Sequence, residues 1–238
     1  PIYTVLIFSV MTQVEVLAVP THFIPQDPTL IFYGRVLGLV GEEYTGVKMR
    51  YAVLFVNAFQ NSVIVAGMTT LIAVTVGSVA GYAFARFSFR RKMAIPFFYM
   101  FTLARLVGTH LGLILTHLSF AIPLATWVLL GYFANLPLEV ERAGRMDGLG
   151  RLSVLFRIVI PMAKGGVASV GILMFLLSWS EFFFALILTV GSPAETVPPV
   201  VSQLTSILVG IAHPSLLAAS TCISLVPVII MGVIFQRY

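Results

Sequence analysis

The stretch Pro137–Pro161, PLEVERAGRMDGLGRLSVLFRIVIP, is a charged segment between two long apolar runs, Leu111–Phe133 and Gly166–Thr189. Hydrophobic residues make up 59% of the 238-residue chain, and charged residues make up only 10%. Soluble domains carry about a quarter charged residues. The chain is therefore predicted to be an all-α integral membrane protein in which this polar stretch connects two spans.

The apolar runs predict spanning helices, because about 20 apolar residues cross a hydrocarbon core of ~30 Å. Uncharged runs at 62–84, 111–133 and 216–235 reach this length, and the run at 166–189 does so with one acidic residue, Glu181. Six crossings also require two shorter runs. These lie at 1–13, expected to be truncated at its start, and at 93–106, expected to be incomplete with residues missing near 103–107.

The basic residues predict the orientation of the chain. With six crossings, one side holds Arg86, Arg90, Arg91, Lys92, Arg142, Arg145, Arg151, Arg157, Lys164 and Arg237. The opposite side holds only Arg35, Lys48, Arg50 and Arg105. Because short cytoplasmic loops are enriched in Lys and Arg, the 134–165 loop is predicted to be cytoplasmic.

The first half of this loop has the punctuation of a short helix. Pro137 suits a first helical turn, where its missing N–H is not needed. Leu138–Met146 is then predicted to be helical, with Glu139 and Glu141 near the positive end of the helix dipole. Asp147-Gly148 is a turn signal that ends this helix.

A second helix is predicted over Leu152–Ile160. Its apolar residues Leu152, Leu155, Phe156 and Val159 recur at the spacing of a single helix face. An ordered polar segment between two spans favours a docking surface for a soluble partner. The alternative from spacing alone is an ordinary inter-helix loop with a solvated charged face.

The loop resembles the cytoplasmic "EAA" loop of permease subunits in ABC importers. The matching residues are Pro137, Glu139, Ala143, Asp147, Gly148, Phe156, Ile158 and Pro161. Other stretches are similar to the maltose-type carbohydrate uptake subfamily, and within it to the shorter subunit of the permease pair. These stretches are Asn61-Ser62, Tyr82–Arg86, Thr21–Tyr33 and Trp179–Phe182.

The resemblance implies a type I importer permease of six transmembrane helices, with residues 1–238 as one domain and a coupling loop at 134–165. It implies a homologous second permease as heterodimer partner, two cytoplasmic ATP-binding subunits and an extracytoplasmic solute-binding protein. The location would be the cytoplasmic membrane of a bacterium or archaeon. ATP and Mg would be bound by the partner ATPases, since this chain lacks a G-x-x-x-x-G-K-[ST] phosphate-binding loop. The chain itself is predicted to be a non-catalytic subunit that binds no cofactor, metal or nucleic acid.

The same resemblance implies which loop residues couple to the ATPase: Glu139, Glu141, Arg142, Ala143, Gly144, Asp147, Gly148 and Phe156. Two of them depart from the family pattern, because Arg142 replaces the Glu that names the motif and Gly144 replaces its second Ala. Either the ATPase carries a compensating acid opposite Arg142, or Glu141 takes over the pairing. Gly144 would cost the helix roughly 0.5–1 kcal/mol unless the ATPase needs close approach there.

Five residues are candidates for the solute path. Glu181 is the only acid within a predicted span, and intramembrane charge is usually functional or faces a wet cavity. Trp179 could stack on a sugar ring, although aromatic residues are common at membrane interfaces. The neighbouring Ser180 is a further candidate for the path. Thr116 and His117 could line the pore, although a packed, hydrogen-bonded histidine is the alternative.

The predicted function is therefore a permease that forms half of an ATP-driven pore for a sugar or sugar-like solute. One alternative is an ABC permease for a phosphate ester or other non-sugar solute. Another is a stand-alone secondary transporter, which would need inverted repeats or broken helices around an ion site. An intramembrane enzyme would need paired catalytic residues within spans, and Glu181 with a distant histidine is a thin basis for one.

Overall fold

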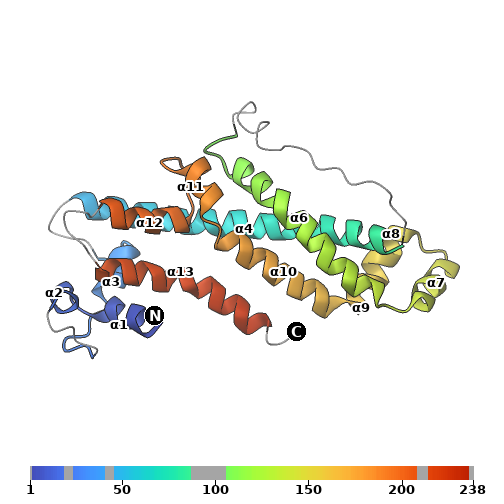
Figure 1. Ribbon diagram of the computed structural model, residues 1–238, viewed down its shortest axis with the longest axis horizontal. Helices are drawn as coiled ribbons and strands as arrows, with labels where there is room; N and C mark the ends of the chain where they lie inside the picture. Colours follow the sequence, from blue (N-terminus) through green and yellow to red (C-terminus); the bar gives the residue numbers. More distant parts are fainter. Residues whose placement is uncertain (1, 19–23, 41–45, 87–105, 208–213, 236–238) are drawn as a thin grey trace. The chain divides into compact units, whose positions relative to one another are not determined.

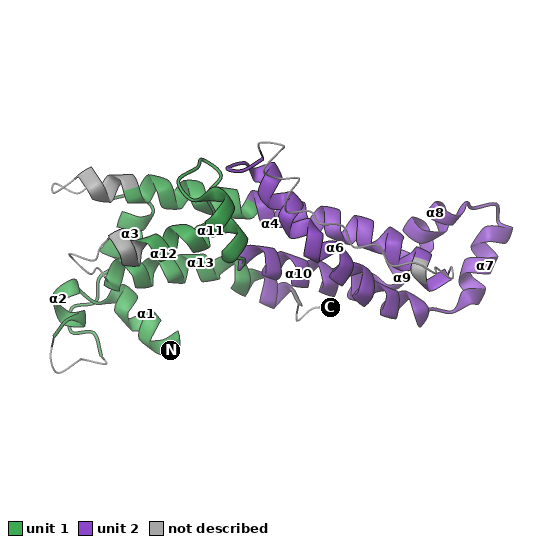
Figure 2. Ribbon diagram, turned by 45° about the horizontal axis from the view of Figure 1, so that its top comes forward, with its two compact units in different colours: residues 1–63, 181–230 green, residues 64–180, 231–238 purple. Residues whose placement is uncertain are grey.

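The structure is a computed structural model that describes residues 2–18, 24–40, 46–86, 106–207 and 214–235. These residues form helices and connecting turns, and none of them forms a strand (Figure 1). The prediction of an all-α chain is thus confirmed for the described residues. Two compact units can be distinguished, residues 1–63 with 181–230 and residues 64–180 with 231–238 (Figure 2).

The structure describes thirteen helical segments, including one π-helical turn, within these residues. In order they are α1 (Ile2–Val10), α2 (Gln13–Val16), α3 (Ile31–Val36), α4 (Gly46–Arg86), α6 (His110–Ala134), α7 (Leu138–Met146), α8 (Arg151–Val154), η1 (Leu155–Val159), α9 (Ile160–Met162), α10 (Lys164–Trp179), α11 (Phe183–Thr189), α12 (Val197–Ile207) and α13 (Pro214–Phe235).

Three helices among the described residues are long and apolar enough to cross a membrane. They are Tyr51–Ala83 within α4, His110–Ala134 and Pro214–Ile234. A fourth crossing is possible if Arg151–Met162 and Lys164–Trp179, which are bent by 88°, form one span. The predicted spans at 111–133 and 216–235 are confirmed as helices, while the predicted span at 93–106 and the gap near 103–107 fall almost entirely outside the described residues.

The α4 helix begins well before the predicted start of its span. The sequence predicts a span that begins at residue 62, whereas the helix is continuous from Gly46 to Arg86. Phe55 and Ala58 in this added part are each 1% exposed. They are buried because they pack against other helices of the first unit. The start of the most apolar stretch therefore did not mark the start of the helix.

The predicted span at 166–189 is not a single helix, because the helix is interrupted after Trp179. The Glu181 carboxylate accepts hydrogen bonds from the backbone N–H groups of Phe184 at 2.8 Å and Ala185 at 3.0 Å. A side chain that takes these N–H groups starts a new helix instead of continuing the old one. The run therefore forms α10 and α11 with a break between them.

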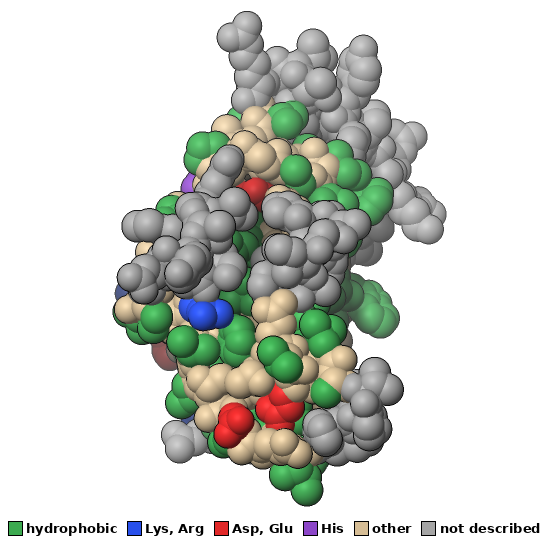
Figure 3. All heavy atoms as spheres, turned by 90° about the vertical axis from the view of Figure 1, so that its left-hand side faces the viewer, with side chains coloured by type: hydrophobic (Ala, Val, Ile, Leu, Met, Phe, Trp, Pro, Cys, Tyr) green, Lys and Arg blue, Asp and Glu red, His purple; other side chains and the backbone are tan. Residues whose placement is uncertain are grey.

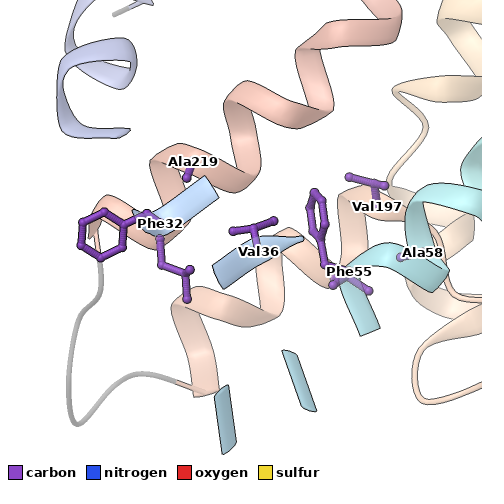
Figure 4. Packing of buried hydrophobic residues seen from close by; sticks show 8 residues of the cluster. Phe32, Val36, Phe55, Ala58, Val197 and Ala219 are labelled. Carbon is purple, nitrogen blue, oxygen red and sulfur yellow. The ribbon is translucent and has the colours of Figure 1, made fainter. Parts of the chain in front are cut away.

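A hydrophobic core in the first unit joins helices that are distant in sequence. It contains Phe32, Val36, Phe55, Ala58, Val197, Val200, Leu216 and Ala219, which come from α3, α4, α12 and α13 (Figure 4). The α12 helix lies between the predicted spans at 166–189 and 216–235, where the sequence predicts no span. Packing against the other three helices explains why this stretch is helical.

Side chains of α4 fasten the segment that leads into α12. Asn61 Nδ2 donates to the carbonyls of Pro193 at 2.8 Å and Glu195 at 2.7 Å, and Ser62 Oγ accepts from the Val197 N–H at 2.8 Å. The Glu195 side chain is itself buried, and this burial raises the pKa of its carboxyl group. These bonds satisfy backbone groups before α12, so the segment has a defined position in the first unit.

Large apolar side chains are exposed on both units. Trp127 on α6 is 72% exposed and Ile229 on α13 is 61% exposed. The face drawn in Figure 3 likewise shows hydrophobic side chains between a few charged ones. Lipid or a partner chain would cover such surfaces, in agreement with the membrane spans inferred from length and composition.

In the second unit, the C-terminal part of α4 lies close to the C-terminal part of α6, the helix that leads to the charged loop. A Cβ atom placed on Gly81 would lie 3.2 Å from the backbone N of Leu130 and the carbonyl O of Thr126. Small residues permit such close helix packing in membrane proteins. The C-terminal end of α4 is thereby held beside α6, from which the loop begins (Figure 1).

Candidate functional site

The charged loop contains the two helical segments that the sequence predicts. The first, α7, has the predicted bounds Leu138–Met146 and ends at Asp147. Gly148 follows with φ of +85°, a conformation that favours glycine, so the turn falls where the Asp-Gly pair indicated it. The chain is then helical from Arg151 to Met162, with a π-helical turn, η1, in the middle.

The predicted apolar face of the second segment is only partly correct. Leu155 and Val159 are buried, but Leu152 is 60% exposed and Phe156 is 49% exposed. Val154 is fully buried instead. The buried side therefore runs through Val154, Leu155 and Val159, and it is set by packing against α7.

Gly144 permits close contact within the loop itself. A Cβ atom at this position would lie 2.5 Å from Cδ1 of Ile158 on η1. The sequence analysis looked to an ATPase surface for a reason to tolerate glycine in this helix. The structure supplies a nearer one, because α7 packs directly against the following helical segment at Gly144.

The Glu141 side chain faces inward and is 7% exposed. Its Oε2 accepts a hydrogen bond from the Tyr82 hydroxyl at 3.0 Å, and its carboxylate forms an ion pair with the Arg86 guanidinium. Arg86 Nε lies 3.0 Å from Glu141 Oε1, and Arg86 Nη2 also donates to the Phe133 carbonyl at 3.2 Å. We call these four residues, Tyr82, Arg86, Phe133 and Glu141, the loop anchor.

The loop anchor connects three helices through charged and polar groups. Tyr82 and Arg86 lie four residues apart and therefore share one face of α4, while Phe133 lies near the end of α6 and Glu141 lies on α7. A partly buried carboxylate that is bonded to a guanidinium and a phenol has little freedom to turn outward. The anchor therefore fixes α7 to the ends of α4 and α6.

Beside the anchor lies a pocket of about 210 Å³. It is lined by Tyr82, Arg86, Leu138, Glu141, Arg142, Arg145 and Arg151. Arg142, Arg145 and Arg151 are all exposed, so arginines form its solvent-facing part. We call these three side chains the arginine rim.

The predicted coupling residues separate into two groups. Glu141 and Gly144 are buried in the second unit, whereas Glu139, Arg142, Ala143, Asp147, Gly148 and Phe156 are exposed. The sequence pointed to Tyr82 and Arg86 only through the family resemblance and, for Arg86, through the orientation of the chain, and it did not indicate their contact with Glu141. A tyrosine and an arginine on one face at the end of a span were the available signal, but their partner is 55 or more residues away.

Thr116 and His117, two candidates for the solute path, are buried in the second unit. His117 is 1% exposed, and its Nδ1 lies 2.7 Å from the Ser178 hydroxyl of α10. Thr116 donates to the Gly112 carbonyl in its own helix at 2.9 Å. The packed, hydrogen-bonded alternative for His117 is the arrangement found here, and contact with solute stays a prediction for both residues.

The other three candidates lie around the break between α10 and α11. Trp179 is 4% exposed and stacks on Phe175 with ring centroids 5.7 Å apart. Ser180 is exposed and donates to the Leu176 carbonyl at 2.7 Å. Glu181 holds the first N–H groups of α11, as described above, so the polar atoms of these residues have local partners.

The part of the chain that the structure describes contains no group of three or more His, Cys, Asp or Glu side chains that could hold a metal ion. Its long apolar helices place the chain in the class of multi-pass membrane proteins. The profile of one transport family, described as the inner membrane component of binding-protein-dependent transport systems, matches residues 83–238. The chain belongs to this family, which confirms the family prediction made from the sequence.

Two curated relatives and one solved structure extend this result. The trehalose/maltose transport system permease protein MalG of Thermococcus litoralis is 32% identical over 235 residues, which cover 90% of this chain and 83% of that protein. The trehalose transport system permease protein SugB of Mycobacterium tuberculosis is 32% identical over 201 residues, covering 77% and 73%. A chain from a bacterial ABC transporter involved in alginate import has the same fold, with a TM-score of 0.71, 22% identity and coverage of 100% and 89%.

Proposed function

We propose that the chain forms half of the translocation pore of an ATP-driven ABC importer for a sugar or sugar-like solute. Membership of the family supports the permease role. The trehalose and maltose systems to which two relatives belong support the class of solute. ATP hydrolysis would take place on partner subunits, where ATP and Mg bind.

The observation that carries the coupling role is the loop anchor. A helix that a partner displaces can move a span only if the two are connected rigidly, because a loose connection would absorb the displacement. Glu141 connects α7 to α4 through Tyr82 and Arg86, and Arg86 reaches the end of α6 through Phe133. In this proposal an ATPase moves α7, and the anchor passes that motion to α4 and α6.

The proposed assembly contains a homologous second permease, two ATP-binding subunits and an extracytoplasmic solute-binding protein. The chain would act as one permease domain with six spans, and its 134–165 loop would face the cytoplasm of a bacterium or archaeon. The distribution of basic residues supports this orientation. The solute path would pass near Thr116, His117, Trp179, Ser180 and Glu181.

Reconstitution tests this proposal directly. The chain is co-expressed with its neighbouring importer subunits, and the purified complex is placed in liposomes with ATP inside and the binding protein outside. Uptake of radiolabelled trehalose or maltose that requires ATP supports both the mechanism and the solute class. ATP-dependent uptake of a phosphate ester alone would overturn the sugar assignment, and uptake by the chain without any ATPase would overturn the importer mechanism.

A further inference from the structure

We propose that the pocket beside the loop anchor binds an acidic side chain of the ATPase partner, held by the arginine rim of Arg142, Arg145 and Arg151. This inference rests on the proposed function, since it assumes that α7 docks on an ATPase. It concerns which charges meet where α7 contacts the ATPase. The sequence left two alternatives, an ATPase acid that pairs with Arg142 or a basic ATPase residue that pairs with Glu141.

The structure removes Glu141 from that choice. Its carboxylate faces inward, where it contacts the Tyr82 hydroxyl and the Arg86 guanidinium. To meet a basic group of a partner it would have to break this ion pair and leave Arg86 partly buried without it. Separating such a pair costs several kcal/mol, so Glu141 serves its own chain and not the partner.

The remaining charge around the pocket is positive. Four guanidinium groups and one carboxylate line it, and Arg86 already neutralises the carboxylate of Glu141. The exposed Arg142 and Arg145 lie three residues apart on α7, and Arg151 follows at the start of α8. A basic side chain entering here would meet like charge, whereas a carboxylate could accept paired hydrogen bonds from a guanidinium.

Apolar side chains beside the arginine rim favour a protein as the source of this carboxylate. Leu138, which lines the pocket, is 42% exposed, and Met146, four residues after Arg142 on α7, is 83% exposed. Protein interfaces combine a desolvated apolar centre with arginine, whereas an anionic lipid headgroup needs only the charge. The occupant is therefore assigned as an Asp or Glu of a protein surface that also covers these side chains.

The test uses the full importer complex, purified in detergent through a tag on this chain, with the amount of co-purified ATPase as the readout. Arg142→Glu and Arg145→Glu reverse the charge at the arginine rim, and Arg142→Lys preserves it. Arg157→Glu is the matched control, because Arg157 is an exposed arginine of the same loop that does not line the pocket. Equal yield and the same size-exclusion profile for each variant establish that the permease is folded.

We expect Arg142→Glu to reduce the recovered ATPase at least about tenfold, since like charges at an interface cost several kcal/mol and 1.4 kcal/mol corresponds to tenfold. Arg145→Glu should have a similar effect, while Arg157→Glu should stay within about twofold of the unchanged chain. Arg142→Lys should lose less ATPase than Arg142→Glu, because it keeps the positive charge but not the paired hydrogen bonds of a guanidinium. A second-site change from Asp or Glu to Lys in the ATPase that restores binding to Arg142→Glu would identify the acid.

Three outcomes would overturn the inference while leaving the importer proposal intact. In the first, Arg142→Glu and Arg145→Glu retain the ATPase. In the second, Arg157→Glu loses it equally, which indicates a general effect of loop charge. In the third, ATPase binding is unchanged but the variants lose binding to vesicles that contain anionic phospholipid, which assigns the pocket to a lipid headgroup. Failure of the unchanged chain to co-purify with any ATPase would instead contradict the proposed function itself.

Discussion

The charged loop at 137–162 and the five candidate solute-path residues place their polar groups in different ways. In the loop, Glu141 is held inside by the anchor while the arginine rim faces solvent beside it. Around the proposed path, the polar atoms of His117, Ser180 and Glu181 have partners in their own or a neighbouring helix. In the loop, the arginine side chains remain exposed, where a partner could contact them. The polar atoms of the path candidates are instead hydrogen-bonded within the fold.

The largest expected effect comes from Glu141→Gln. Loss of the carboxylate charge leaves Arg86 partly buried without its ion pair, which should lower the stability of the chain by about 3 kcal/mol. ATP-dependent uptake should also fall, because α7 is no longer fixed to α4 and α6. Thermal unfolding of the purified complex and uptake into liposomes measure the two effects.

Glu139→Gln serves as the control for this change, since Glu139 is an exposed carboxylate on the same helix. It should leave stability within about 0.5 kcal/mol of the unchanged chain. If Glu141→Gln were equally harmless, the loop anchor would have no structural role and the contrast between inward and outward charges would disappear.

A second change tests the close packing of the loop. Gly144→Leu places a side chain where even a Cβ atom would meet Ile158 Cδ1 at 2.5 Å, so it should destabilise the loop by about 2 kcal/mol. Ile158→Ala in the same chain should restore part of this loss by making space. Thermal unfolding of the single and double variants measures the coupling.

Ala143→Leu, at the exposed neighbouring position, is the matched control and should be nearly neutral. The expectation fails if Ile158→Ala gives no recovery, because the loss would then arise outside the contact between α7 and η1. A defect in ATPase binding without loss of stability would show instead that Gly144 allows close approach of the ATPase, the alternative considered from the sequence.

Glu181→Gln asks whether this acid serves the fold or the solute. The charged oxygens bind two N–H groups at the start of α11, and their loss should reduce stability by about 1 kcal/mol. Ser180→Ala should have less effect, because its hydroxyl is exposed and bonds only within α10. A rise in the KM for solute uptake at unchanged thermal stability would show instead that Glu181 lines the path.

The smallest expected effect is that of Ser178→Ala. This change removes the hydroxyl that lies 2.7 Å from His117 Nδ1 and should cost about 0.5–1 kcal/mol. Ser169→Ala on the same helix is the control, because the Ser169 hydroxyl bonds only to Gly165 of α10. Substrate selectivity altered by Ser178→Ala, with no loss of stability, would place His117 on the solute path.

Much of the loop was predictable because its signals are local. Pro137 and the Asp147-Gly148 pair mark both ends of α7, and their effects act within a few residues. The buried face of the next segment was less predictable, since the side that is covered depends on packing of α8 and η1 against α7 and not on local spacing. The partners of Glu141 could not be predicted at all from spacing, because they lie on other helices.

Composition and apolar run length were thus sufficient for the membrane class, and local punctuation was sufficient for the ends of α7, because each depends on neighbouring residues or on sums over the chain. The family followed from the resemblance of the loop to a known motif. The start of α4, the break before α11 and the inward turn of Glu141 depended on contacts between segments distant in sequence. Such contacts decide which polar groups are hydrogen-bonded or ion-paired inside the fold. These contacts bury Glu141 and leave the adjacent Arg142 exposed. The difference in exposure arises only when α4 and α7 pack together.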